Sequence, residues 1–73
     1  MTQCQIEMSL GEKIKFLREE KGITQQMLAD VFNINRVTIT GYEIGRRIPD
    51  VFTLKKIADI LDVTIDYLLE ENL

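Results

Sequence analysis

The stretch that decides the fold of this chain runs from Ile23 to Gly45 and reads ITQQMLADVFNINRVTITGYEIG. It predicts two short helices joined by a tight turn. Thr24 is a good N-cap for the first helix, because its hydroxyl can accept a free backbone N–H of the first turn. Asn33 can end that helix, because asparagine enters the left-handed region more cheaply than most residues do. Asn35 then serves as a second N-cap, and Gly45 is a C-terminal glycine that closes the second helix.

The apolar residues of this stretch indicate which faces of the two helices are buried. Leu28, Ala29 and Phe32 lie on one face of the first helix. Ile39 and Tyr42 share a face of the second helix. Two short helices arranged in this way are the plan of a helix-turn-helix, whose second helix, the recognition helix, lies in the major groove of DNA.

One further helix is predicted before this stretch and two are predicted after it. Numbered along the whole chain, the helix before this stretch is the first. Ser9 and Glu12 can form a capping box at its start. Asp50 follows a proline and can cap the fourth helix. The core-facing residues of these outer helices are the apolar ones at helical spacing. They are Leu10, Ile14 and Leu17 in the first helix, Leu54, Ile57, Ala58 and Leu61 in the fourth, and Ile65, Leu68 and Leu69 in the fifth.

The composition fits one small globular domain. The 73 residues are 45% hydrophobic and 29% charged, which argues against disorder. We expect an all-α domain of five short helices over residues 9–73, with the helix-turn-helix at about 24–44 and a flexible lead-in at residues 1–8. Cys4 is the only cysteine, so an intramolecular disulfide is impossible and a reducing cytoplasm is the expected compartment. No apolar run approaches the length of a membrane span, so no membrane partner is expected.

A set of residues at characteristic spacings extends from Leu10 to Leu69. The set consists of Gly11, Ile14, Leu17, Arg18, Gly22, Ile23, Thr24, Gln25, Leu28 and Ala29, then Ile34, Asn35, Arg36, Ile39, Tyr42, Glu43, Gly45, Arg46, Arg47 and Pro49, and finally Leu54, Ile57, Ala58, Leu61 and Val63. In this pattern the chain resembles the lambda-Cro/repressor type of helix-turn-helix domain, the family of phage repressors and bacterial XRE-like regulators. The resemblance implies a sequence-specific transcriptional regulator that binds double-stranded DNA, with repression as the expected action. A domain this small buries little DNA surface, so we expect a dimer on a palindromic operator.

Base contacts are expected from the recognition helix. Arg36 can donate two hydrogen bonds to N7 and O6 of guanine, and Val37 can rest on a thymine methyl group. Thr40 is a third candidate. Gly41 stands where relatives often have a long polar side chain. It therefore either removes one base-reading side chain or lets the helix approach the groove closely.

Contacts to the DNA backbone are expected from five residues. Gln25 begins the first helix of the motif, where free N–H groups suit a phosphate oxygen. The resemblance implies either a phosphate contact by Gln25 or a hydrogen bond that steadies the recognition helix. Arg46 and Arg47 follow the recognition helix, where relatives place basic residues. Asn35 and Thr38 complete the set.

The net charge of −3 is unfavourable for DNA binding, because affinity for the duplex rests largely on neutralising phosphates. The distribution of charge reduces this objection. Residues 9–50 hold seven basic and six acidic side chains, whereas residues 51–73 hold two and five. The excess of acidic residues thus lies in the C-terminal third, which this fold would turn away from DNA.

The resemblance also implies two structural contacts. Arg18 and Glu43 would meet as a partly buried ion pair that ties the first helix to the third. Ile65 and Tyr67, with Phe52 at the start of the fourth helix, would form the interface of a weak homodimer assembled mainly on DNA. The alternative is that these three residues cover the core of their own domain.

Two other classes of function are open to this sequence. One is a protein-interaction module of the same fold, such as an antitoxin, and a protein antagonist is a further candidate partner. A long extension for toxin binding would favour that class, and we find none among the 73 residues. The other class is an enzyme. The sequence has no histidine and one cysteine, which removes most catalytic bases, nucleophiles and metal ligands, so we expect no catalytic residues, no metal and no cofactor.

Overall fold

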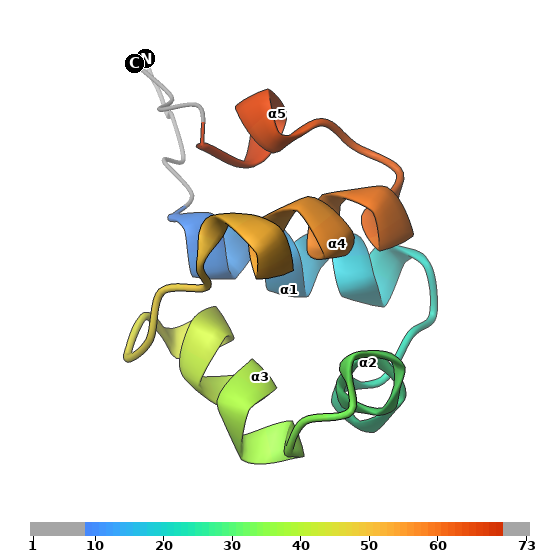
Figure 1. The fold of residues 1–73 in the computed structure, drawn as a ribbon. Coiled ribbons are helices and arrows are strands. Elements are labelled where there is room, and N and C mark those ends of the chain that lie inside the picture. Colours follow the sequence, from blue (N-terminus) through green and yellow to red (C-terminus); the bar gives the residue numbers. More distant parts are fainter. Residues whose placement is uncertain (1–8, 70–73) are drawn as a thin grey trace, which may run out of the picture.

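The computed structural model describes residues 9–69, which form five α-helices around a shared core (Figure 1). The helices are α1 (Leu10–Glu20), α2 (Gln25–Phe32), α3 (Arg36–Ile44), α4 (Val51–Leu61) and α5 (Ile65–Leu69). In Figure 1, α1 and α4 cross the middle of the view, α5 lies above them, and α2 and α3 lie below. The predicted all-α class with five helices is confirmed. The predictions for residues 1–8, including Cys4, lie outside the described residues.

Helices α1 and α4 begin at the predicted caps. The Oγ of Ser9 accepts the N–H of Glu12 at 3.2 Å, and the Glu12 carboxylate accepts the N–H of Ser9 at 2.9 Å, which completes the capping box. The carboxylate of Asp50 accepts the N–H of Thr53 at 2.8 Å. This hydrogen bond from Thr53 lowers the pKa of the Asp50 carboxyl below its ordinary value of 3.8.

The turn between α2 and α3 is built by backbone conformations that the sequence indicates. Thr24 caps α2 by accepting the N–H of Met27 at 3.0 Å. Asn33 ends α2 in the left-handed region, with φ 58° and ψ 44°, and Gly45 ends α3 with φ 83°. Asn35 occupies the N-cap position of α3, but its exposed side chain makes no capping hydrogen bond with any residue in the range 9–69. Asn35 therefore contributes to the first turn of α3 through its backbone oxygen, which accepts the N–H of Thr38 at 3.0 Å, and not through its side chain.

The core consists of two clusters of buried apolar side chains that meet at Phe32 and Tyr42. The larger cluster contains Ile14, Leu54, Ile57, Ala58, Leu61 and Leu68. The smaller cluster contains Leu28, Ala29 and Ile39, all completely buried. Phe32 and Tyr42 pack against both clusters. The helix-turn-helix is therefore fixed to the rest of the domain by continuous apolar contact.

A close approach of backbone to backbone occurs where α1 packs on α3. Gly11 is buried there. A Cβ atom at position 11 would lie 2.4 Å from the backbone oxygens of both Tyr42 and Glu43. Carbon and oxygen atoms cannot approach so closely, so this packing requires a glycine. The sequence pattern contains Gly11 but does not reveal why it is there.

The prediction that Leu69 faces the core is wrong, because its side chain is 55% exposed. Leu68 is buried, and successive residues of a helix are rotated by about 100°, so both side chains cannot point inward from a helix of this length. Ile65, three residues before Leu68, is partly buried against the larger cluster. Ile65 therefore offers less surface to a partner than we expected.

Candidate nucleic-acid interface

The outward surface of α3 carries the residues predicted to contact bases. The side chains of Arg36 and Val37 are exposed, and those of Thr38 and Thr40 are partly exposed. Ile39, on the opposite side of α3, is completely buried. The buried side fixes the helix to the domain, so the orientation of the outward surface is determined by the core.

Gln25 joins the start of α2 to this surface. Its amide nitrogen donates to Oε1 of Glu43 at 2.9 Å. Its amide oxygen accepts from Oγ1 of Thr40 at 3.0 Å and from Nη1 of Arg36 at 3.5 Å. The amide has one orientation that fits both neighbours, with nitrogen toward the carboxylate and oxygen toward the donors. Of the two roles implied for Gln25, the structure contains the hydrogen bonds that steady the recognition helix.

The Arg18–Glu43 ion pair is present and almost fully buried. Nε of Arg18 lies 2.6 Å from Oε2 of Glu43, and Nη2 donates to Oε1 at 3.2 Å. The two side chains are 8% and 2% exposed. Nη1 of Arg18 donates to the backbone oxygen of Ile23 at 2.8 Å, so the guanidinium also holds the segment before α2. With the amide of Gln25, these bonds connect the buried pair to the surface of α3.

Gly41 is covered by the side chain of Arg47. A Cβ atom at position 41 would lie 3.1 Å from Cδ and 3.3 Å from Cγ of Arg47. The backbone oxygen of Gly41 accepts the N–H of Arg46 at 2.9 Å and that of Arg47 at 3.1 Å. Both arginines are exposed overall. The segment after α3 therefore folds back on the helix, and the bare surface at Gly41 is filled from within the chain.

The positive charge available to DNA is smaller than the sequence predicted. Lys13 is 3% exposed, and its Nζ donates to the backbone oxygen of Tyr67 at 3.0 Å and lies 5.2 Å from the centre of the Tyr67 ring. Arg18 is buried with Glu43. Two of the seven basic residues counted in 9–50 are therefore structural. The exposed ones are Lys15, Lys21, Arg36, Arg46 and Arg47.

Apolar surface is exposed near the predicted dimer residues. Phe52 is 77% exposed and Tyr67 is 43% exposed. Sequence reasoning missed further exposed apolar side chains in the loop before α4 and at its first residue, namely Ile48 and Val51. Val51 lies three residues before the buried Leu54, at the spacing of a core residue, and Ile48 precedes the helix, so only the structure reveals that both are exposed.

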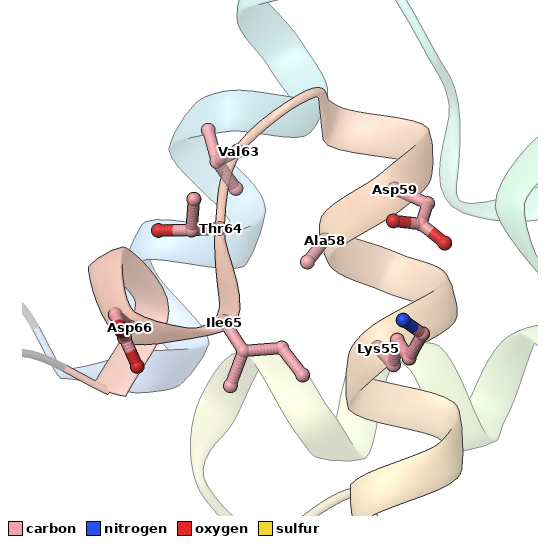
Figure 2. Close-up of a pocket in the computed structure, with 7 residues that line it drawn as sticks. All are labelled: Lys55, Ala58, Asp59, Val63, Thr64, Ile65 and Asp66. Atoms are coloured by element: carbon pink, nitrogen blue, oxygen red, sulfur yellow. The ribbon is translucent and has the colours of Figure 1, made fainter.

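A separate cavity of about 340 Å³ lies between α4 and α5 (Figure 2). Its lining residues, as far as the structure describes them, belong to α4, α5 and the turn between them: Lys55, Ala58, Asp59, Val63, Thr64, Ile65 and Asp66. Residues 9–69 contain no group of side chains placed to hold a metal ion. Within the same range, none of the helices has the length and apolar character needed to cross a membrane.

Known proteins share this architecture. A family model described as helix-turn-helix (HTH_3) matches residues 14–68. The chain is 49% identical over 60 residues to YqaE, a helix-turn-helix-type transcriptional regulator of Bacillus subtilis; the match covers 82% of this chain and 52% of YqaE. The chain spans about half the length of the curated relatives it matches.

Two solved structures support the same assignment. The P22 c2 repressor in complex with a synthetic operator has a TM-score of 0.79 and 28% identity, with 94% of this chain and 97% of that chain covered. SinR of Bacillus subtilis, in its complex with SinI, has a TM-score of 0.75 and 29% identity, with 84% and 60% covered. The fold is therefore lambda-repressor-like, and the chain belongs to the XRE, or Cro/C1-type, helix-turn-helix family.

Proposed function

We propose that the protein is a sequence-specific DNA-binding transcriptional regulator that places α3 in the major groove. The observation that carries this proposal is the continuous set of bonds from the buried Arg18–Glu43 pair through Gln25 to the surface of α3. A reading surface that is held in place before binding loses less conformational entropy when it meets DNA. The similar P22 c2 repressor is bound to an operator, which supports the same use of the fold here.

The proposed base contacts follow from the chemistry of each side chain on the outward surface of α3. Arg36 would read guanine, Val37 would contact a thymine methyl group, and Thr40 would contribute a hydroxyl. Contacts to phosphate are proposed for Asn35, Thr38 and Arg46. For Gln25 the proposed contact is made by the backbone N–H groups at the start of α2, because its side-chain amide already bonds to Glu43 and Thr40. Each phosphate that a cationic side chain neutralises would add roughly −0.9 to the slope of log affinity against log salt concentration. Arg46 and the other exposed basic residues, and not the neutral contacts, would therefore set the salt dependence.

The test of this function is selection of bound duplexes from a random DNA pool, followed by gel shifts of the selected sequence at several salt concentrations. We expect one enriched motif with two-fold symmetry and a steep salt dependence. Absence of any enriched motif would contradict the proposal. A pool is the right probe because it assumes nothing about the operator.

The Arg36→Ala variant should lose about 1–3 kcal/mol of binding free energy on the selected sequence and should relax the preference at one base pair. Its contact with Gln25 is long, so the fold should be little affected. Gel shifts on selected and scrambled duplexes measure both effects. Arg46→Ala is the matched control, since it removes the same charge and should weaken binding to all sequences alike. An identical motif with and without the Arg36 side chain would exclude it as a base contact.

We further infer that the regulator acts as a weak homodimer assembled mainly on DNA, with Phe52, Tyr67 and the partly buried Ile65 at the interface. The support is the exposure of Phe52 and Tyr67, together with that of Ile48 and of Val51, which directly precedes Phe52. Covering such surface in a dimer removes apolar area from water. Two recognition helices about 34 Å apart would then match successive major grooves on one side of the duplex.

The Tyr67→Glu variant is expected to abolish self-association in sedimentation and to remove cooperativity in titrations of a palindromic duplex, because it buries a charge at the interface. The domain should still fold, since Lys13 keeps its hydrogen bond to the backbone oxygen at position 67 when its contact with the Tyr67 ring is lost. Val31→Glu, which changes an exposed apolar residue of α2, should leave self-association intact. A Tyr67→Glu protein that binds a palindrome as cooperatively as the parent would exclude this surface as the interface.

Repression by occupying the operator is the proposed action, in the cytoplasm, and a protein antagonist is a second proposed partner. SinR, which shares the fold, is found in a complex with SinI. A pull-down of partner proteins, carried out beside the DNA selection, separates a DNA-binding function from a protein-interaction function. A protein-interaction module without DNA-binding activity would capture a partner and enrich no DNA motif, whereas an antitoxin that also binds DNA would do both.

A further inference from the structure

We propose that Arg47 is a base-reading residue that acts from the surface of α3 left bare by Gly41. The inference rests on the proposed function of DNA binding. It differs from the expected role of Arg47, which was a contact to the DNA backbone that would be indifferent to sequence.

Gly41 lies on the same side of the recognition helix as an exposed apolar residue. Gly41 follows Val37 by four residues, so the two positions lie on one side of α3, a turn apart. The side chain of Val37 is 69% exposed, which marks this side as the outward one. Gly41 nevertheless has little exposed surface. Three carbon atoms of the Arg47 stem, Cβ, Cγ and Cδ, lie 3.6, 3.3 and 3.1 Å from where a Cβ of residue 41 would be.

The stem of Arg47 is held on α3 by a backbone hydrogen bond and by packing of its methylene groups. Its backbone N–H donates to the oxygen of Gly41 at 3.1 Å, and its methylene groups pack on the helix surface. A long side chain that already lies along an apolar surface loses fewer rotamers on binding than a free one. The side chain beyond Cδ is the guanidinium group, and Arg47 is exposed overall. The charged group is thus presented at the outward side of α3.

The chemistry of the guanidinium group suits a contact with a base. A guanidinium group presents two parallel N–H donors that match N7 and O6 of guanine in the major groove. Gly41 lies five residues after Arg36, which corresponds to about 7.5 Å along α3. Arg47 would therefore read a base pair different from the one assigned to Arg36. An ordinary side chain at position 41 would occupy the space of the Arg47 stem, so the glycine and the arginine act as one unit.

The experiment is selection from the same random DNA pool with the parent, Arg47→Ala, Arg47→Lys and Gly41→Leu. For Arg47→Ala we expect the preference at one base pair to fall by about 5- to 150-fold, the range of one good bidentate contact. Arg47→Lys keeps the charge but loses the planar fork, so it should relax the same base pair while the salt dependence stays as in the parent. Gly41→Leu fills the space of the stem and should relax that base pair too.

Arg46→Ala is the matched control. It removes a neighbouring exposed arginine whose N–H bonds to the same oxygen of Gly41. It should weaken binding uniformly and keep the motif. If Arg47→Ala also keeps the motif and weakens all sequences equally, Arg47 is a backbone contact and the inference is wrong, while the motif of the parent still supports the proposed function. If Gly41→Leu keeps the motif, the side chain of Arg47 does not contact a base from the surface at Gly41. If the parent itself enriches no motif, the proposed function fails first.

Discussion

Glu43→Ala is expected to lower the free energy of unfolding by about 3–5 kcal/mol, because it leaves the Arg18 guanidinium buried without its carboxylate. The amide nitrogen of Gln25 loses its acceptor in the same variant. A domain of ordinary stability unfolds at a cost of only about 5–15 kcal/mol, so this single change removes a large share of the total. Urea unfolding followed by circular dichroism measures the loss.

Glu20→Ala is the matched control for this prediction. Glu20 is exposed on α1, where removal of a carboxylate should change stability by no more than about 0.5 kcal/mol. Glu43→Gln keeps the shape and one acceptor oxygen, so it should fall between the two and remain folded enough to measure. Equal unfolding midpoints for Glu43→Ala and Glu20→Ala would show that removing one partner of the buried pair costs no more stability than removing an exposed carboxylate.

The second large effect is expected for Gly11→Ala. This change should lower the free energy of unfolding by an amount at or above the upper part of the range of about 1–3 kcal/mol that is typical when a side chain is enlarged in a packed core. The added methyl group would lie 2.4 Å from two backbone oxygens of α3. Rotation of a side chain cannot relieve a contact with backbone, so α1 must move away from α3. That movement would also stretch the bonds between Arg18 and Glu43, which join the same two helices.

Gly41→Ala provides the comparison for Gly11→Ala. Both glycines are helical, but the nearest atoms to position 41 belong to the flexible side chain of Arg47. The stem can shift by a few tenths of an ångström, and alanine favours the helix over glycine by about 1 kcal/mol. Thermal unfolding should therefore show Gly41→Ala at or above the parent and Gly11→Ala well below it. Similar midpoints for the two variants would mean that α1 and α3 do not depend on this close approach.

The fold could be predicted because its signals are local. The caps at Ser9, Thr24 and Asp50 and the left-handed Asn33 each depend on a few neighbouring residues, and all four have the predicted conformation or hydrogen bond. The apolar spacing within α4 likewise identified its buried side chains. The contact between Arg18 and Glu43 is not local, and only the family resemblance made it predictable.

The features that escaped prediction depend on contacts between distant segments. Lys13 looks like any basic residue of an amphipathic helix, yet its ammonium group reaches a backbone oxygen 54 residues away. The tight fit at Gly11 depends on how closely α1 approaches α3. The covering of Gly41 by Arg47 depends on a loop that folds back on its own helix. In each case the residue type permits the contact without indicating its partner.

The single orientation of the Gln25 amide has a consequence for reprogramming this protein. Transplanting the α3 sequence of another regulator is a natural way to change the operator that is recognised. The amide nitrogen is committed to Glu43, so its oxygen always points toward positions 36 and 40. A transplanted residue at position 40 that offers a donor would keep this bond, whereas aspartate or glutamate would set two acceptors against each other. Successful exchange of specificity therefore requires that position 25 be chosen together with the helix that it holds.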